Sequence, residues 1–291
     1  MSNSSFNEMN KIFEDVEIPT SFNELNKSDS SLPDLDAIIE EGIKATNSDE
    51  DSDIRIPGYH PSQISSKTCV RFYVLHSLPE FHLDSKFNAT TLEIFDVGND
   101  THKRIQRYLS PYLKGTWVCR RCGTFHNKNY DTDLQPIKDV SPKHKPDNCD
   151  NCGYKYFKYM EWKIMSQNGI RGSIDGIIEY DNQVGGIEIK STKSFIWNKL
   201  SVDMDMVKKY AKQFAIYLKE LNLDWGKFIF ENKDSHQKKY LTIRNGEIDL
   251  SDIYYTIDLA NEYKSRKKLP KARLCDDCKE CPYYKSKFCN P

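Results

Sequence analysis

Nine cysteines punctuate the chain, and four of them form a repeated motif that constrains how the chain can fold. The motif Cys-x-x-Cys-Gly occurs at residues 119–123 and again at residues 149–153. Each glycine lets the chain turn back so that backbone amides approach the thiolates. The pattern predicts a structural zinc ribbon over residues 115–155, with iron or a disulfide as the alternatives. Its four predicted ligands to one tetrahedral ion are Cys119, Cys122, Cys149 and Cys152.

The cysteine pairs and the hydropathy of the chain also bear on its compartment. Paired cysteines in a reducing compartment indicate metal ligands before they indicate disulfides. No apolar run approaches the roughly 18 residues that a membrane span needs, so we expect no membrane association. Residues 1–10 lack the basic and apolar regions of a signal peptide. We therefore expect a cytoplasmic protein, or one in the host cytoplasm if it is viral.

The formal net charge of −1 hides two segments of opposite charge. Residues 1–53 hold 14 acidic and 3 basic side chains, a balance of −11, and the remaining residues carry +10. The acidic segment has little apolar surface, so we expect a mostly disordered tail in which residues 35–43 could form a transient or partner-bound helix. It is either a solubilising tail, a docking segment or a strip that competes with a polyanion. The basic body, residues 54–291, is expected to bind a polyanion such as nucleic acid.

The order of predicted elements in the body indicates a mixed α/β fold. Apolar spacing favours helices over residues 61–78, from near residue 92 or 98, over 203–221 and over 250–263. Strands are expected at residues 173–180, 184–191, 227–231 and 240–244, and residues 115–155 look like a loop. The first two strands flank a polar turn and predict a β-hairpin.

This hairpin places three charged residues in apolar strands. Asp175 lies on the first strand, and Glu188 and Lys190 share one face of the second. Carboxylates from the two strands could meet and bind a hard divalent cation, because the ion offsets their repulsion and desolvation. Lys190 would then orient or help deprotonate a water molecule. The alternative is an exposed sheet face with an ordinary ion pair.

The arrangement resembles the PD-(D/E)xK nuclease superfamily, in which an acid on one strand and acid-x-Lys on the next bind the catalytic metal. The motif here is Ile174-Asp175 followed by Glu188-Ile189-Lys190, with isoleucine in place of the proline, which is not a ligand. The resemblance implies a restriction-endonuclease-like core, a mixed central sheet flanked by helices, in which the zinc ribbon is an insertion.

Two more segments are similar to the RecB-like branch of this superfamily. Residues 98–102 resemble its Gly-x-x-x-His helix, which implies that His102 is a metal ligand. Residues 213–217 resemble its Gln-x-x-x-Tyr helix, and a spacing of four puts Gln213 and Tyr217 on one helical face. The implied Mg²⁺ or Mn²⁺ ligands are His102, Asp175, Glu188 and the carbonyl of Ile189; the implied catalytic set is Asp175, Glu188, Lys190, Gln213 and Tyr217.

The remaining cysteines lie at the two ends of the body. Cys69 precedes the predicted core, and Cys275, Cys278, Cys281 and Cys289 follow it. This distribution resembles the iron–sulfur branch of the RecB-like nucleases, which includes the CRISPR-associated adaptation exonuclease. The resemblance implies a [4Fe–4S] cluster that joins the chain ends. Its implied ligands are Cys69, Cys278, Cys281 and Cys289, with Cys275 as an alternative ligand and a zinc site or free thiols as alternative interpretations.

Two further features leave alternatives open. Glu161 either supports the predicted metal site or forms a surface ion pair. The predicted ribbon is basic, so it either staples a long loop or also contacts DNA backbone or a partner. Its basic residues are Arg120, Arg121, Lys128, Lys143 and Lys145.

Taken together, these patterns predict a metal-dependent deoxyribonuclease. We expect an exonuclease that acts on DNA ends or single strands in replication, recombination, repair or DNA capture, with a helicase, recombinase or other replication protein as a possible partner. The alternative is a DNA-binding assembly or adaptor protein that keeps the scaffold without cleavage. No motif specifies the polarity of cleavage, the choice between endonuclease and exonuclease, or the oligomeric state.

Overall fold

The computed structural model describes residues 38–44, 57–81, 87–131, 133, 135–180, 182–200, 204–275 and 278–291. The chain forms two compact units, residues 1–50 and 51–291. In the first unit, residues 38–44 are helical, which agrees with the helix expected near residues 35–43. Lys44 and Glu40 form an exposed ion pair of 2.6 Å along this helix. The rest of the predicted acidic tail lies outside the described residues.

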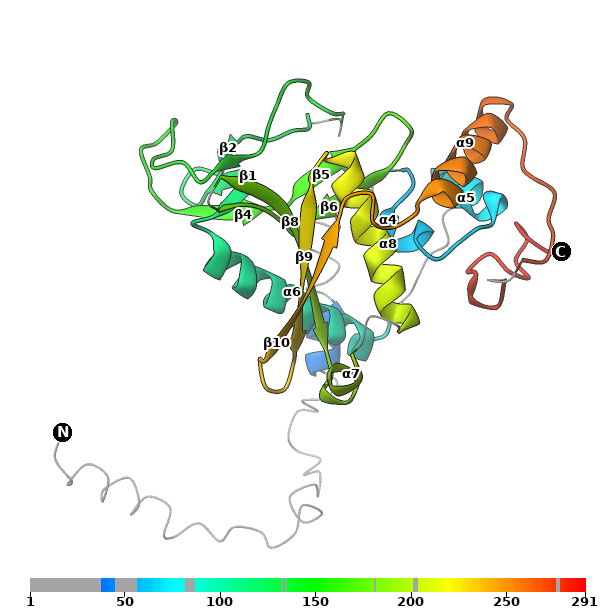
Figure 1. Cartoon of the computed structure of the whole chain (residues 1–291), viewed down its shortest axis with the longest axis horizontal. Coiled ribbons are helices and arrows are strands. Elements are labelled where there is room, and N and C mark those ends of the chain that lie inside the picture. Colours follow the sequence, from blue (N-terminus) through cyan, green and yellow to red (C-terminus); the bar gives the residue numbers. More distant parts are fainter. Residues whose placement is uncertain are drawn as a thin grey trace, which may run out of the picture. The chain divides into compact units, whose positions relative to one another are not determined.

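The second unit contains a mixed sheet with the strand order β10-β9-β8-β7-β1-β2 (Figure 1). Strands β8 and β9 are parallel, and the other neighbours on this path are antiparallel. The fold is therefore the mixed α/β class predicted from the sequence. The strands of this path are β1 (Leu113–Cys119), β2 (Phe125–His126), β7 (Gly176–Tyr180), β8 (Gln183–Thr192), β9 (Trp225–Asn232) and β10 (Lys238–Arg244).

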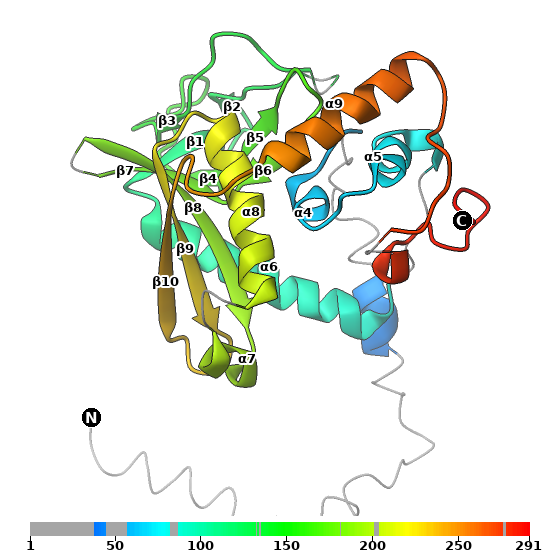
Figure 2. The same ribbon diagram turned by 45° about the vertical axis from the view of Figure 1, so that its right-hand side comes forward.

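Helices flank both faces of this sheet (Figure 2). On one face, Ile105 of α6 joins a cluster with Ile187, Ile189 and Ile229. On the other face, Phe214 of α8 packs against Phe228 with ring centroids 4.8 Å apart. None of the helices in the described ranges is long and apolar enough to cross a membrane. The helices of this unit are α4 (Pro61–Ile64), α5 (Val70–His76), η1 (Pro79–Phe81), α6 (Ala89–Leu109), α7 (Ser194–Lys199), α8 (Asp205–Glu220), α9 (Ser251–Ser265) and η2 (Cys278–Glu280).

The predicted hairpin is present, but its first strand bends at Asp175. Residues Arg171–Ile174 form β6, which pairs only with β5 (Trp162–Met165), whereas β7 begins at Gly176 and joins the main sheet. Asp175 therefore lies where the chain passes from one sheet to the other. The turn is shorter than expected, because Tyr180 already pairs with Gln183.

The segment expected to be a loop, residues 115–155, is built on a strand of the main sheet, so that expectation was wrong. At its start β1 pairs with β7, and further along it pairs with β4 (Phe157–Met160) and β2, while β3 (Lys143–His144) also pairs with it. Trp117 of β1 is 1% exposed, in a small core with Leu113 and Cys119. The segment with the two cysteine knuckles is therefore part of the main sheet and is not a separate loop attached to it.

The helix expected over residues 61–78 is interrupted, so that prediction was also wrong. It forms as α4 and α5, and Cys69 precedes the first residue of α5. The hydroxyl of Tyr73 lies 3.1 Å from the carbonyls of Ile64 and Lys67, which binds the unwound segment between the two helices. The next helix, α6, begins earlier than expected, because Asn88 caps it by accepting a 2.8 Å hydrogen bond from the amide of Thr91.

Candidate metal centres

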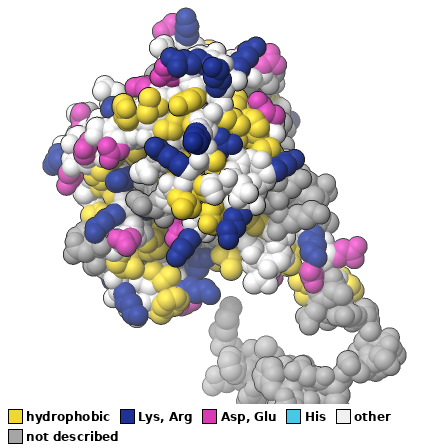
Figure 3. Space-filling model, turned by 90° about the vertical axis from the view of Figure 1, so that its right-hand side faces the viewer, with side chains coloured by type: hydrophobic (Ala, Val, Ile, Leu, Met, Phe, Trp, Pro, Cys, Tyr) yellow, Lys and Arg dark blue, Asp and Glu magenta, His cyan; other side chains and the backbone are white. Residues whose placement is uncertain are grey.

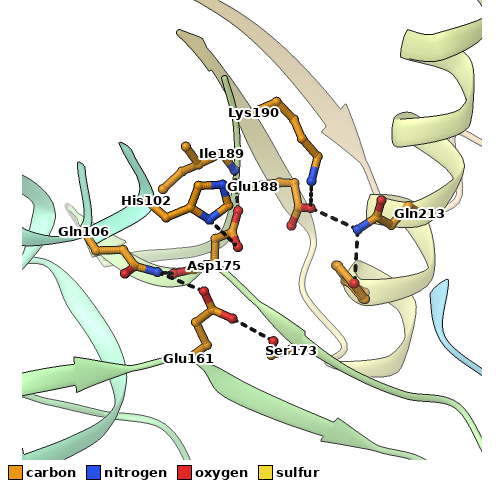
Figure 4. Close-up of polar contacts among 10 residues, drawn as sticks. His102, Gln106, Glu161, Ser173, Asp175, Glu188, Ile189, Lys190 and Gln213 are labelled. Carbon is orange, nitrogen blue, oxygen red and sulfur yellow. Dashed lines mark hydrogen bonds and ion pairs between the residues drawn. The ribbon is translucent and has the colours of Figure 1, made fainter. Parts of the chain in front are cut away.

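The bend at Asp175 brings a histidine and two carboxylates together (Figure 4). One possible ligand atom from each of His102, Glu161 and Asp175 lies within 4.8 Å of the others. His102 extends from α6, and its Nδ1 is 3.2 Å from Oδ1 of Asp175. Glu161 precedes β5, and its carboxylate accepts a 2.7 Å hydrogen bond from the Ser173 hydroxyl. This group of side chains could bind a metal ion.

The second strand contributes the other predicted residues. Glu188 is 2% exposed, and its Oε1 lies 2.6 Å from Nζ of Lys190 and 3.1 Å from Nε2 of Gln213. The amide of Gln213 also donates to the Tyr217 hydroxyl at 3.1 Å. Gln213 thus contacts the Glu188 carboxylate, and Tyr217 contacts Gln213.

Backbone geometry orders the two strands at this point. The amide of Ile189 donates a 2.6 Å hydrogen bond to Oδ2 of Asp175. The N–H and C=O groups of one strand residue point to the same edge of the strand. The carbonyl of Ile189 therefore faces the side on which Asp175 lies, as a ligand role would require.

The charges in this centre shift the pKa values of its acids in different directions. Burial, followed by the charge of Asp175, raises the pKa of Glu161 to about 7 and that of Glu188 to about 8. Burial alone would raise the pKa of Asp175, but the hydrogen bond and charge of His102, with Lys190, lower it. Burial opposes the charged form of Lys190, but Glu188 and Asp175 outweigh it and raise the pKa of the lysine. Their surroundings thus favour the charged forms of Asp175 and Lys190 and the protonated forms of the two glutamates.

Two of the residues that organise the centre were not among the predicted ones. Nε2 of Gln106 donates to the backbone carbonyl of Asp175 at 2.8 Å and lies 3.3 Å from Glu161. Ser173 donates to Glu161 from β6. The spacing of four between His102 and Gln106 on one helix was the available signal for Gln106. Of the two alternatives for Glu161, the structure favours membership of the site.

The four cysteines of the predicted ribbon also come together. Their Sγ atoms lie within 4.8 Å of one another, so this group could bind a metal ion. Gly123 and Gly153 have φ angles of 70° and 71°, the left-handed region that glycine favours, and each amide donates to the carbonyl of the first cysteine of its knuckle. Cys119 and Cys149 are buried, whereas Cys122 and Cys152 lie nearer the surface. The two knuckles thus have the same backbone geometry and face each other.

The cysteines at the two ends of the body are neighbours in space. Cys69 is among the neighbours that raise the pKa of the Cys275, Cys281 and Cys289 thiols, and Sγ of Cys275 is 3.1 Å from that of Cys278. Burial and these neighbouring thiols raise the pKa of Cys281 and Cys289. All five are free cysteines. The predicted alternative that includes Cys275 therefore stays open, because Cys275 lies beside Cys278.

One arginine connects this cysteine group to the chain ends. Nε of Arg71, on α5, donates to the carbonyl of Phe288 at 3.0 Å, and Nη1 also bonds the carbonyl of Pro270. Tyr59 donates to Asn261 of α9 at 2.8 Å. Hydrogen bonds thus join the first and last segments of the second unit.

No protein-family model matches the chain, and no curated protein matches it. Among solved structures, the chain is similar to SSO0001 with 13% identity and a TM-score of 0.39, over 86% of this chain and 93% of that one. It is similar to the alkaline exonuclease LHK-Exo of Laribacter hongkongensis, with 13% identity and a TM-score of 0.39, over 73% of this chain and 94% of that one. The complex of LHK-Exo with dAMP gives 15% identity at the same TM-score. Similarities this low carry no argument about chemistry, which rests on the site itself.

Proposed function

We propose that the chain is a metal-dependent nuclease that hydrolyses phosphodiester bonds in DNA. The observation that supports it most is the state of Glu188. Its carboxylate is buried, yet Oε2 has no hydrogen-bond partner among the described residues, while Oε1 is held by Lys190 and Gln213. A buried carboxylate oxygen without a partner is costly, and a divalent cation would satisfy it.

The donor set fits a hard divalent ion. Imidazole and carboxylate groups from His102, Glu161 and Asp175 converge, and Glu188 and the carbonyl of Ile189 complete the set that we assign to Mg²⁺ or Mn²⁺. When bound, such an ion polarises the scissile phosphate and lowers the pKa of the attacking water. A cation would also relieve the repulsion that raises the pKa of Glu161 and Glu188.

The chain's own groups would orient the reactants. The side chain of Lys190 is 20% exposed and its ammonium is held by Glu188, so the ammonium can hold the water molecule and balance charge that develops on the phosphate. Gln213 fixes the rotamer of Glu188 through its amide and in turn contacts Tyr217. Through this chain of contacts Gln213 and Tyr217 position the acid, and we propose that they also position the substrate.

The two cysteine groups are proposed to be structural. The Cys119, Cys122, Cys149 and Cys152 thiolates suit a tetrahedral Zn²⁺ ion, and their knuckle geometry supports that assignment. For Cys69, Cys278, Cys281 and Cys289 we propose a [4Fe–4S] cluster, supported by the clustering of thiols from both chain ends. Cys275 is the fifth thiol in that group, and it is the alternative ligand.

The substrate that we propose is DNA ends or single strands, in replication, recombination, repair or DNA capture. The charge of +10 on residues 54–291 supports a polyanionic substrate. A helicase, a recombinase or another replication protein is the proposed kind of partner. The proposed metal centre has side chains from α6, α8 and the sheet around it. Single strands and DNA ends are narrow enough to bring their phosphate backbone to such a centre.

The decisive experiment is incubation of anaerobically purified protein with end-labelled single-stranded and double-stranded DNA, with Mg²⁺, Mn²⁺ or EDTA in parallel. We expect shortening of the labelled strand with either metal and none with EDTA or with the Asp175→Asn variant. Absence of metal-dependent cleavage on every DNA, in a protein that still binds DNA, would favour the adaptor alternative.

A further inference from the structure

A groove of about 440 Å³ lies between α6 and the segment that carries the second cysteine knuckle. One wall is formed by the C-terminal half of α6, and the other by residues around β1 and β4. The groove has a polar and charged rim above a floor that includes the buried Trp117. It lies outside the group of carboxylates described above.

The groove is rich in cations. Within the described ranges, Asp100 is the one carboxylate residue that lines it. Six exposed basic side chains line it without a carboxylate partner in those ranges: Lys103, Arg107, Arg120, Lys145, Lys155 and Lys158. Like charges this close repel one another, so their concentration in one groove is explained most simply by a polyanionic ligand.

The groove adjoins the proposed metal centre at Gln106. Gln106 lines the groove, and its amide also donates to the backbone carbonyl of Asp175 at 2.8 Å. The same amide lies 3.3 Å from the carboxylate of Glu161. A strand lying along the cations would therefore run directly beside the centre at which we propose cleavage.

The groove also offers an aromatic surface. Tyr156 lines it and is 66% exposed, with its ring 5.3 Å from that of Tyr154. Exposed rings beside a basic channel are the arrangement that single-stranded nucleic acid uses, because unpaired bases stack on them while phosphates meet the cations. A volume of this size suits a narrow ligand rather than a duplex.

We propose that this groove binds one strand of nucleic acid, with its phosphates on the cations of both walls and a base against Tyr156. The inference rests on the proposed function and deepens it, because it assigns the path by which a single strand meets the carboxylate centre. It also gives the cysteine knuckles a role in substrate binding through the wall that they support.

Other faces of the unit are available for comparison. On the side shown in Figure 3, Lys and Arg side chains are interspersed with acidic and hydrophobic ones. Arg244 ends β10, at the opposite edge of the sheet from β1, and Lys268 follows α9; both are exposed. Their simultaneous replacement by glutamate changes the net charge as much as a double replacement in the groove does.

The test measures binding of a fluorescent oligothymidylate of about 20 nucleotides. It is carried out in EDTA, so that cleavage plays no part. The groove variant is Arg107→Glu with Lys158→Glu, one residue from each wall, and the control is Arg244→Glu with Lys268→Glu. We expect the groove variant to bind about tenfold or more weakly than the control. The slope of log binding constant against log salt concentration should become shallower by about 1.4 in this variant, because each lost phosphate contact on a single strand removes about 0.7.

The Tyr156→Ala variant tests base stacking separately from charge. It should weaken binding of the oligothymidylate about fivefold or more, and should leave the salt slope unchanged, because stacking is not ionic. Equal affinities and equal slopes for the groove and control variants would overturn the proposal. A groove variant that weakens binding of a hairpin duplex and leaves single-strand binding intact would overturn the assignment to one strand.

Cleavage with Mn²⁺ is read separately on the same variants. If the wild-type protein cuts no DNA but the groove variant still loses single-strand binding, the groove proposal stands and the nuclease proposal fails. If the wild-type protein cuts DNA and the groove variant binds and cuts like the control, the nuclease proposal stands and the groove proposal fails.

Discussion

The carboxylate of Asp175 accepts a 2.6 Å hydrogen bond from the backbone amide of Ile189, so a side chain takes the place of a backbone carbonyl at the end of the β7–β8 ladder. The bend between β6 and β7 makes this contact possible, because the backbone of the first strand leaves the sheet there. The contact fixes Asp175 against the strand that carries Glu188 and Lys190.

Replacing Lys190 with alanine tests the proposed chemistry. Lys190→Ala should reduce metal-dependent cleavage by roughly 10²- to 10³-fold, the scale on which one electrostatic group acts on a transition state. DNA binding and the fold should be largely retained, because the Lys190 side chain is partly exposed. Single-turnover cleavage measures the effect, and Lys227→Ala on the neighbouring strand β9 is the control. A Lys190→Ala protein that cuts at the normal rate would remove the assignment of Lys190.

Glu161 should contribute to metal binding. Glu161→Gln keeps the side-chain volume and removes the negative charge beside His102 and Asp175, so we expect divalent-metal affinity to fall by about 10- to 100-fold. Titration calorimetry with Mn²⁺ measures it. Glu179→Gln is the matched control, because Glu179, on β7, is paired with Lys114 of β1 outside the centre. Equal affinities for the two variants would place Glu161 outside the metal site.

Protein purified without oxygen should be brown and contain about four iron atoms if the terminal cysteines hold a cluster. Cys289→Ser should bleach the colour and lower the melting temperature of the whole second unit, because the cluster joins segments about two hundred residues apart. Iron analysis and thermal unfolding measure both effects. A colourless wild-type protein with two zinc ions and no iron would overturn the cluster and leave the nuclease proposal intact.

The cysteine knuckles should depend on their ion. Cys149→Ser should release about one zinc ion and weaken the core around Trp117, since such ribbons owe most of their folding to the metal. Because β1 also pairs with β7, we expect the loss to spread to the edge of the main sheet. Hydrogen exchange on β1 and β7 measures that spread. Protection of β7 that matches the wild type after zinc loss would show that the knuckles fold independently.

The buried carboxylate of Glu231 should make stability depend on pH. Burial favours its protonated form, but hydrogen bonds from Arg104, His236 and Lys238 outweigh burial and lower its pKa. A group whose pKa is lower in the folded state contributes its full stabilisation when the pH is above its pKa in the unfolded chain. This contribution is lost as the pH falls through its pKa in the folded protein. Glu231→Gln should therefore cost about 1.5 to 3 kcal/mol at neutral pH and less in acid.

Urea unfolding at several pH values measures this difference. Glu93→Gln replaces an exposed carboxylate of α6 and is the control. The difference in unfolding free energy between Glu231→Gln and the wild type should be constant above about pH 4.5 and shrink below it. A difference that grows as the pH falls would contradict the assigned direction of the pKa shift.

Local spacing was sufficient for much of the fold. The helical period of residues 203–221 and the alternation in the hairpin predicted α8, β7 and β8, because periodicity reports which side of an element is buried. The Cys-x-x-Cys-Gly repeat predicted four thiols that meet, because each knuckle is a local turn closed by its own glycine. Local sequence patterns did not predict the strand β1, because the strands that pair with it lie far along the chain.

The sequence by itself determined which residue types could bind metal: acid on one strand, acid-x-Lys on the next, and a histidine on a preceding helix. Only the tertiary structure decided that Glu161 and Gln106 join them, since the segment before β5 and the helix α6 that carry these residues meet only in the folded chain. It also decided that Asp175 lies at a bend between two sheets and that Cys69 meets cysteines more than two hundred residues away. These contacts depend on long-range packing, because the burial of apolar faces in a shared core determines which distant side chains meet.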